Sequence, residues 1–146
     1  MRVLVQRVKF AEVQAHSQRV GQIEQGLLVY VGVGEGDGPK QAQWLAEKVS
    51  QMRIFENESG KMNLSVQDVR GGVLVVPSFT LLADARQGRR PDFTAAAKPE
   101  AAEELFEQFL ASLKATGVPV AAGIFGAEMA VRSDADGPVN IILDAP

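Results

Sequence analysis

The sequence predicts a single α+β domain in which two amphipathic helices cover a large, mainly antiparallel and barrel-like β-sheet. Length is the first observation, because 146 residues make about one ordinary domain with room for a real core. Composition is the second, since 46% hydrophobic and 23% charged residues are typical of soluble globular proteins. The third is patterning, because about seven short strand-like runs accompany two stripes of helical spacing. No repeat or linker divides the chain, so residues 1–146 form one predicted domain.

The first third of the chain predicts strands. Residues 3–10 and 12–16 are rich in valine and alternate between apolar and polar side chains, and Gly21 marks a tight turn. Residues 26–33 form an apolar run short enough to be a buried strand. His16, the single histidine, falls on the polar face of its strand, where we expect it to be solvated and without a catalytic role.

Two segments have the spacing of amphipathic helices. The first begins at Pro39 and places apolar side chains on one face as far as residue 52. The second begins near Pro99, carries acidic residues in its first turns and ends at Gly117. Both apolar stripes need a surface to cover, which predicts a helical layer packed on the sheet.

The rest of the chain predicts a loop and more strands. Further strands are expected at residues 53–55, 72–76, 118–122, 128–133 and 138–143. A turn at residues 134–137 separates the last two, and residues 83–99 form a long surface loop. The final strand is apolar on both faces, which predicts either burial within one subunit or contact with a second copy in a homodimer.

Composition excludes several kinds of site. With no cysteine there is no disulfide framework, no thiolate nucleophile and no cysteine-ligated metal. One histidine cannot build a multi-histidine metal site, so we expect no metal and no cofactor. Charges interrupt the apolar residues of segment 1–7, which argues against a signal peptide or a membrane span. Together with the absence of cysteine, this predicts a cytoplasmic location.

The glycine-rich stretch at residues 32–40 occupies the place of a phosphate-binding loop but lacks its chemistry. The spacing of the glycines fits neither the dinucleotide fingerprint nor the P-loop. Pro39 removes a backbone amide, and the carboxylates of Glu35 and Asp37 would repel a phosphate. This stretch therefore indicates a flexible turn between a strand and a helix.

Three other segments carry candidate functional groups. Arg86, Arg89 and Arg90 lie within five residues of loop, which indicates either an anion-binding site or a solvated charge cluster. The segment at residues 77–82 brings two hydroxyls and an aromatic ring to the end of the strongest strand, where hydroxyls serve either as caps or as site residues. Gly137-Pro138 before a strand indicates a plain turn or a peptide that presents bare carbonyls, and such a bond can be cis.

Taken together, blocks along essentially the whole chain resemble the D-aminoacyl-tRNA deacylase family. Several blocks in the correct order are far more specific than any single one. They are QRV at residues 6–8, RIF at 53–55, GKMNLSV at 60–66, VVPSFTL at 75–81, GRRPDF at 88–93 and DGPVN at 136–140. The resemblance implies a homodimeric cytoplasmic esterase that removes D-amino acids, and often glycine mischarged on alanine tRNA, from tRNA as a proofreading step of translation.

The resemblance also assigns roles to residues. Gly137 and Pro138 would be held in cis and reach into the other subunit's pocket, where they exclude L side chains, and Arg7 would fix their orientation. Phe79 and Thr80 would line that pocket and hold the ester, with Ser78 beside them. The family relies on the 2′-hydroxyl of the terminal ribose for chemistry, which suits an activated ester that needs mainly positioning and carbonyl polarisation. The arginines at 86, 89 and 90 are then expected to contact tRNA.

Two departures from the family pattern bear on this assignment. The usual Ser-Gln-Phe-Thr-Leu is Pro77-Ser78-Phe79-Thr80-Leu81 here, and the usual Gly-Pro-Val-Thr ends in Asn140. The missing glutamine removes a side-chain amide and Pro77 removes a backbone donor. A paralogous deacylase that acts on L-alanyl-tRNA has proline at the first of these positions but lacks the phenylalanine, so Phe79 favours the D-specific group.

Three alternatives remain beside this interpretation. Thr80 would be a covalent nucleophile in the first, although the sequence offers it no base. In the second, the changed motif leaves a non-catalytic tRNA-binding module. In the third, the protein is a paralogue-like deacylase with altered amino-acid selectivity.

Overall fold

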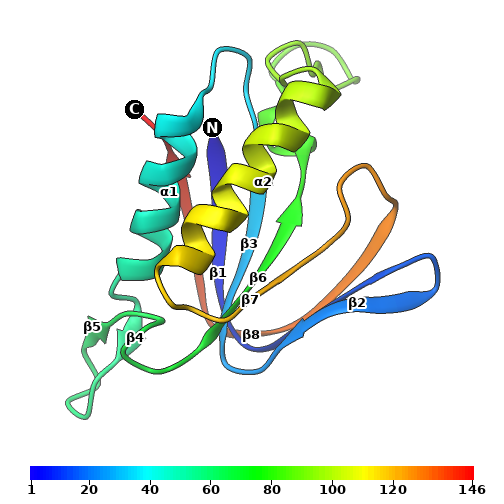
Figure 1. The fold of residues 1–146 in the computed structure, drawn as a ribbon. Coiled ribbons are helices and arrows are strands. Elements are labelled where there is room, and N and C mark those ends of the chain that lie inside the picture. The colour runs from blue at the N-terminus through cyan, green and yellow to red at the C-terminus, as the bar shows by residue number, and fades with distance from the viewer.

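The computed structural model describes all residues from 1 to 146 and shows one curved sheet with two helices on one of its faces (Figure 1). The elements, in chain order, are β1 (Arg2–Ala15), β2 (Gln18–Ile23), β3 (Gly26–Gly32), α1 (Pro39–Gln51), β4 (Phe55–Glu56), β5 (Met62–Leu64), β6 (Gly72–Pro77), the 3₁₀ helix η1 (Phe79–Leu82), α2 (Pro99–Ala115), β7 (Val120–Ala122) and β8 (Met129–Asp144). The α+β class and both predicted helices are confirmed.

The sheet has the order β2-β1-β3-β6-β7, and β8 pairs with β1. The β1 strand pairs antiparallel with β2, β3 and β8, whereas β3–β6 and β6–β7 are parallel. The sheet bends so strongly that β2 returns to contact β6 and β7, which nearly closes a barrel. Small β4 and β5 form a separate hairpin that projects from the body (Figure 1).

Two hydrophobic clusters lie on opposite sides of the sheet. The larger one fills the space between the sheet and the helices, where alternate residues of β1 and β3 such as Val3, Val5 and Val29 meet the apolar stripes of α1 and α2. The smaller one lies inside the bend and includes Val13 and Leu74. Nearly all of β3 is buried, because both faces of the sheet are covered there. This explains why its sequence is a continuous apolar run without polar alternation.

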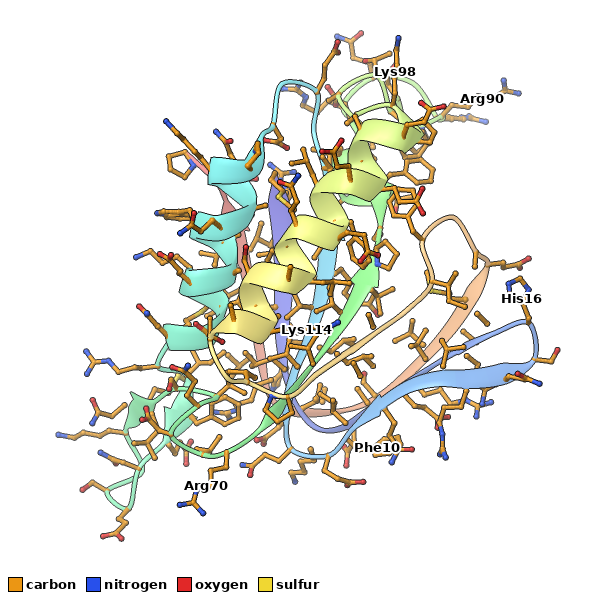
Figure 2. The ribbon with its side chains drawn as sticks, viewed as in Figure 1. Phe10, His16, Arg70, Arg90, Lys98 and Lys114 are labelled. Atoms are coloured by element: carbon orange, nitrogen blue, oxygen red, sulfur yellow. The ribbon has the colours of Figure 1, made fainter.

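Four local predictions about strands were wrong. Gly21 lies in the middle of β2, where a Cβ would come within 3.0 Å of Leu74 and 3.2 Å of the Ala122 carbonyl. Glycine is needed there for close approach as the barrel closes, and the turn itself is formed by His16 and Ser17, with φ of 52° and 62°. His16 is exposed as expected, but it lies at this turn rather than in a strand (Figure 2).

The other two corrections concern strand continuity. Residues 3–10 and 12–16 belong to one strand, β1, because the same chain pairs with β3 first and then with β2. Likewise β8 is one strand that continues past the predicted turn at residues 134–137, where its pairing with β1 is irregular but does not end. A local excess of turn formers does not end a strand whose ladder continues on both sides.

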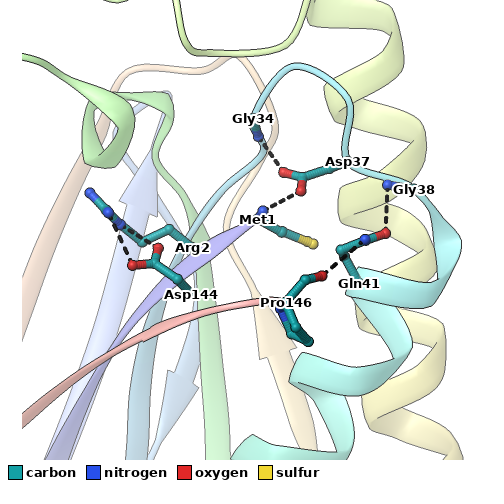
Figure 3. A network of polar contacts seen from close by, with 8 residues as sticks. All are labelled: Met1, Arg2, Gly34, Asp37, Gly38, Gln41, Asp144 and Pro146. Atoms are coloured by element: carbon teal, nitrogen blue, oxygen red, sulfur yellow. Dashed lines mark hydrogen bonds and ion pairs between the residues drawn. The ribbon is translucent and has the colours of Figure 1, made fainter.

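A polar network joins the ends of the sheet to the first helix (Figure 3). The Asp37 carboxylate accepts hydrogen bonds from the Met1 α-amino group and, at 2.6 Å, from the Gly34 N–H. The Gln41 side chain accepts from the Gly38 N–H at 3.1 Å, which caps α1. These contacts fix the conformation of the glycine-rich turn and cap the N-terminus of α1. The turn therefore connects a strand to a helix, as predicted.

Candidate functional site

The first part of the site forms where β6 ends. The Ser78 N–H donates to the Val31 carbonyl at 2.8 Å, and the chain then turns into η1. This places the Phe79 ring 58% exposed, with its edge against Phe93 at a centroid distance of 5.2 Å. The Oγ atoms of Ser78 and Thr80 lie 2.9 Å apart in a hydrogen bond. Two hydroxyls and a ring therefore leave the sheet together, as the sequence predicted.

A cavity of about 770 Å³ opens beside these residues, and we call it the pocket. Such a volume is that of a small-molecule site. Its wall is mainly apolar and comes from several parts of the chain, and it includes Tyr30, Val76, Phe79, Thr80, Phe106 and Phe125. Burial raises the pKa of Tyr30, so this phenol lines the wall in its neutral form.

Pro77, one of the two departures from the family pattern, costs the sheet no hydrogen bond. The Gly123 N–H donates to the Val75 carbonyl at 2.8 Å, so residues 75 and 77 face β7. Since β7 ends at Ala122, the nitrogen of Pro77 points beyond that strand, where proline is tolerated. The proline is thus compatible with an intact β6.

The second part of the site lies in β8 and is a bulge. Gln6 pairs with Asn140 and Val8 with Ala135, so four residues of β8 stand opposite Arg7 alone. We call residues 136–139 the Gly-Pro bulge. Its Gly137-Pro138 peptide bond is cis, and Gly137 has a φ of 127°.

Arg7 is buried against the Gly-Pro bulge. Its side chain is only 7% exposed, and its Nη1 donates to the Ile54 carbonyl at 2.6 Å. Nε donates to the Asp136 carbonyl at 3.3 Å and lies 3.2 Å from the Asp136 carboxylate. The Arg7 guanidinium therefore lies beside the Gly-Pro bulge, with Nη2 3.4 Å from the position that a Cβ of Gly137 would take.

The pocket and the Gly-Pro bulge do not meet within one chain. Arg7 pairs with Leu27 near the start of β3, whereas Ser78 hydrogen-bonds to Val31 near its end. Four residues of strand correspond to about 13 Å. The resemblance assigned these two groups to one site built from two subunits, and within this chain they lie at opposite ends of β3.

The arginines of the loop differ in their surroundings. Arg86 forms an ion pair with Asp84, and its hydrogen bonds lower the pKa of that carboxyl. Arg89 and Arg90 are exposed and form no ion pair. A bridge between Asp84 and Asp92 closes the loop at its base. In Figure 2 Arg90 and Lys98 lie at the same end of the molecule.

Sequence reasoning missed some residues of the site. Phe93 contacts the Phe79 ring edge to face, and Phe125 and Tyr30 line the pocket. The one available signal was an aromatic residue, Phe93, within an otherwise polar loop. Asp136 was assigned to a turn, whereas it contacts the buried Arg7.

The structure contains no group of three or more His, Cys, Asp or Glu side chains that could hold a metal ion. Neither α1 nor α2 combines the length and apolar character that a membrane-spanning helix requires.

Comparison with known proteins gives consistent results. A family profile described as D-Tyr-tRNA(Tyr) deacylase matches residues 4–144. A protein named D-aminoacyl-tRNA deacylase from Thermotoga petrophila is 52% identical over 145 residues, which cover 99% of this chain and 97% of that protein. One of the same name from Geobacter metallireducens is 49% identical over 146 residues, covering 100% and 97%.

Solved structures have the same fold. A structure titled c-Myc DNA Unwinding Element Binding Protein superposes with a TM-score of 0.94 at 37% identity, covering 100% of this chain and 99% of the other. Another, titled as a probable eukaryotic D-amino acid tRNA deacylase, has a TM-score of 0.80 at 15% identity, covers 97% of each chain and supports the fold alone.

Proposed function

The chain belongs to the D-Tyr-tRNA(Tyr) deacylase family and hydrolyses the ester bond of D-aminoacyl-tRNA, and from this premise we propose how its two separated parts make one active site. The aminoacylated 3′ end of tRNA binds in the pocket of one subunit. The Gly-Pro bulge of a second subunit closes that pocket and excludes L side chains. The observation that carries the proposal is the placement of the pocket and the bulge at opposite ends of β3.

The sheet face turned away from the helices supports a homodimer. Ile142, Leu4 and Tyr30 stand directly opposite one another on β8, β1 and β3. Ile142 is 64% exposed, which is unusual for a large aliphatic side chain in the middle of a strand pair. The row continues from Tyr30 to Val76 on β6, and both residues line the pocket, so a second copy docked on this row lies beside the pocket.

The proposed chemistry needs positioning more than a strong nucleophile. Water attacks the ester carbonyl, the bond to the ribose oxygen breaks, and free D-amino acid and tRNA leave. The Thr80 hydroxyl and the backbone N–H groups near Phe79 hold the carbonyl, and the 2′-hydroxyl of the terminal ribose assists. Glycine has no side chain to be excluded, so the same site also hydrolyses glycyl-tRNA mischarged on alanine tRNA.

The body of the tRNA is proposed to contact the loop beside the pocket. Arg89 and Arg90 are free to bind phosphates, whereas Arg86 is already paired with Asp84 and serves more weakly. No cofactor takes part in this proposal. Because its substrate is charged tRNA, the protein is proposed to work in the cytoplasm as a proofreading enzyme of translation.

Mixed dimers test whether the site is shared. Thr80→Trp blocks the pocket from an exposed position, and Gly137→Ala disrupts the Gly-Pro bulge, where a Cβ would lie 2.8 Å from the Val139 nitrogen. Each homodimer should be inactive. Statistical mixing makes about half the dimers mixed, each with one intact site, so about a quarter of parental activity should return. Activity no higher than that of the two variant homodimers, with mixed dimers verified by mass, would contradict a site shared between subunits.

A single-turnover assay separates the alternatives. With D-aminoacyl-, L-aminoacyl- and glycyl-tRNA compared side by side, the proposed enzyme cleaves the D and glycyl esters and spares the L ester. A covalent Thr80 route would leave a trapped acyl-enzyme. A binding module would leave every ester intact, and cleavage of the L ester would indicate a paralogue-like selectivity.

A further inference from the structure

The Arg7 guanidinium is a buried charge with one acidic partner. Its side chain is 7% exposed, and among the ion pairs of the structure Arg7 takes part in one only, with Asp136. A buried charge that loses its counter-charge is strongly destabilised, because neither water nor another ion replaces it. The position of Arg7 therefore depends on the carboxylate of Asp136.

Asp136 is also the first residue of the Gly-Pro bulge. The β1–β8 ladder is interrupted between Gln6 and Val8, so the bulge is not held by regular strand pairing at this point. Nε of Arg7 lies between two oxygens of Asp136, the main-chain carbonyl at 3.3 Å and the carboxylate at 3.2 Å. One guanidinium thus contacts both the backbone carbonyl and the carboxylate of Asp136, the first residue of the bulge.

The other side of the guanidinium is anchored elsewhere. Nη1 donates to the Ile54 carbonyl at 2.6 Å, in the segment that leads into β4. Nη2 lies 3.4 Å from where a Cβ of Gly137 would be. The guanidinium therefore spans from a fixed backbone carbonyl to Gly137, with Asp136 as its counter-charge.

We propose that Asp136 is a positioning residue for the deacylation reaction, whose carboxylate holds Arg7 and through it the Gly-Pro bulge that enters the partner's pocket. This inference rests on the proposed sharing of the site between subunits. Asp136 touches neither substrate nor water in the reaction. Its role is to keep the Gly137 backbone at the distance from the amino acid that admits D and glycyl substrates and rejects L side chains.

Asp136→Asn removes the charge and keeps the shape, and Asp136→Ala removes both. Because a misplacement of about 1 Å costs about 100-fold in rate, we expect kcat on D-aminoacyl-tRNA to fall about tenfold in the first and about 100-fold in the second. The ratio of kcat/KM between D and L substrates should fall as well. KM for tRNA should change less than about twofold, because the tRNA body is bound elsewhere.

Asp134→Asn is the matched control. It lies two residues earlier on β8, is exposed, forms no ion pair and changes the net charge equally. It should leave kcat, KM and the D/L ratio at parental values. Asp136→Glu, which restores the charge, should recover part of the lost kcat. An Asp136→Asn enzyme with parental kcat and D/L ratio would overturn the proposal, and so would a loss that only follows a lower fraction of dimer.

Mixed dimers separate this inference from the proposed function. Asp136→Asn should regain activity with Thr80→Trp and should not with Gly137→Ala, because it belongs with the bulge. If Gly137→Ala and Thr80→Trp complement each other while Asp136→Asn fails to complement Thr80→Trp, sharing of the site stands and the role of Asp136 is overturned. If no pair complements, the shared site itself fails.

Discussion

Two arginine–aspartate pairs join β1 to β8, and they have the same chemistry in different surroundings. Arg2 and Asp144 meet near the pocket, where the side chains are 39% and 59% exposed. Arg7 and Asp136 meet at the Gly-Pro bulge, where the side chains are 7% and 31% exposed. Exposed pairs contribute about 0–1 kcal/mol, whereas loss of one partner from a fully buried pair costs about 3–5 kcal/mol.

The difference in exposure between the two pairs shows that the two ends of the sheet are built differently. At the pocket end, local contacts such as the hydrogen bond between Ser78 and Thr80 lie open to solvent and leave room for a ligand. At the bulge end, a buried side chain from β1 holds an irregular segment of β8 from across the sheet. We therefore expect the bulge end to be the less tolerant of substitution.

The largest effect should come from separating the subunits, because in the proposed site neither end acts alone. Ile142→Lys places a charge in the apolar row of the outer face, where Ile142 is 64% exposed in the single chain. We expect the dimer to dissociate and activity to be lost, as measured by light scattering and deacylation at matched dilution. Val20→Lys, at an exposed apolar residue of β2, should change neither. An active Ile142→Lys monomer would contradict the comparison.

At the bulge end, Gly137→Ala should lower kcat/KM for D-aminoacyl- and glycyl-tRNA alike by at least about 100-fold. The added Cβ would lie 2.8 Å from the Val139 nitrogen and 2.9 Å from its Cγ2, at a φ of 127° that side chains rarely adopt. L activity should not appear. Gly60→Ala is a control for backbone strain, because its φ is 71° and its Cβ would meet nothing within 4 Å. Parental activity in Gly137→Ala would show that the Gly-Pro bulge is not part of the active site.

At the pocket end, Thr80→Ala should weaken deacylation by about 100-fold or less. One lost oxyanion donor costs about 10²–10³ in rate, and the exposed Thr80 is expected at the low end because backbone donors remain. Ser78→Ala, which removes only the partner of that hydroxyl, should have a smaller effect. Complete loss in a folded dimer that still binds tRNA would favour Thr80 as a nucleophile.

In the loop beside the pocket, replacing Arg89 and Arg90 by glutamine should weaken tRNA binding without changing single-turnover kcat. Each lost phosphate contact should lower the slope of log K against log salt by about 0.7–0.9. Arg86→Gln should change the slope less, because Arg86 is already paired with Asp84. An unchanged slope in the double variant would mean that these arginines are merely solvated.

The smallest effect should come from the exposed pair. Arg2 lowers the pKa of Asp144 through a hydrogen bond, so this carboxylate contributes stability above its unfolded pKa of about 3.9 and loses it as the pH falls through its lower folded pKa. Asp144→Asn should cost less than about 1 kcal/mol near pH 7, and the difference from the parent should vanish in acid. Urea unfolding at both pH values measures this, and Asp136→Asn should cost more near pH 7.

Much of the fold followed from local patterns. The spacing of apolar residues predicted α1 and α2 because a helix buries one face, and the valine-rich runs predicted β1, β3 and β6 for the same kind of reason. Gly21 shows the limit of prediction from local patterns. Glycine is needed there because the chain passes close to β7, a contact that exists only after the barrel closes. Strand ends and register depend on partners far along the chain, and a single sequence does not reveal them.

The residues of the site likewise divide into those that the sequence indicated and those that it did not. The resemblance pointed to Phe79, Thr80 and Gly137, which structure places at the pocket and the bulge. The contact between Asp136 and Arg7 joins residues that are 129 positions apart in the sequence, so no local pattern indicates it. The composition of residues 134–137 did indicate an irregularity, although it is a bulge within β8 rather than the end of a strand.

The position of the Gly-Pro bulge has one more consequence, for the solubility of the protein. Because β8 pairs only with β1, its other edge is free and exposes backbone donors and acceptors to any strand that aligns with it. The bulge interrupts that edge, and charged Asp144 lies near its end. The bulge leaves two short regular stretches, residues 129–135 with charged Arg132 and Asp134 and residues 140–144 with charged Asp144, so the distortion also guards against aggregation.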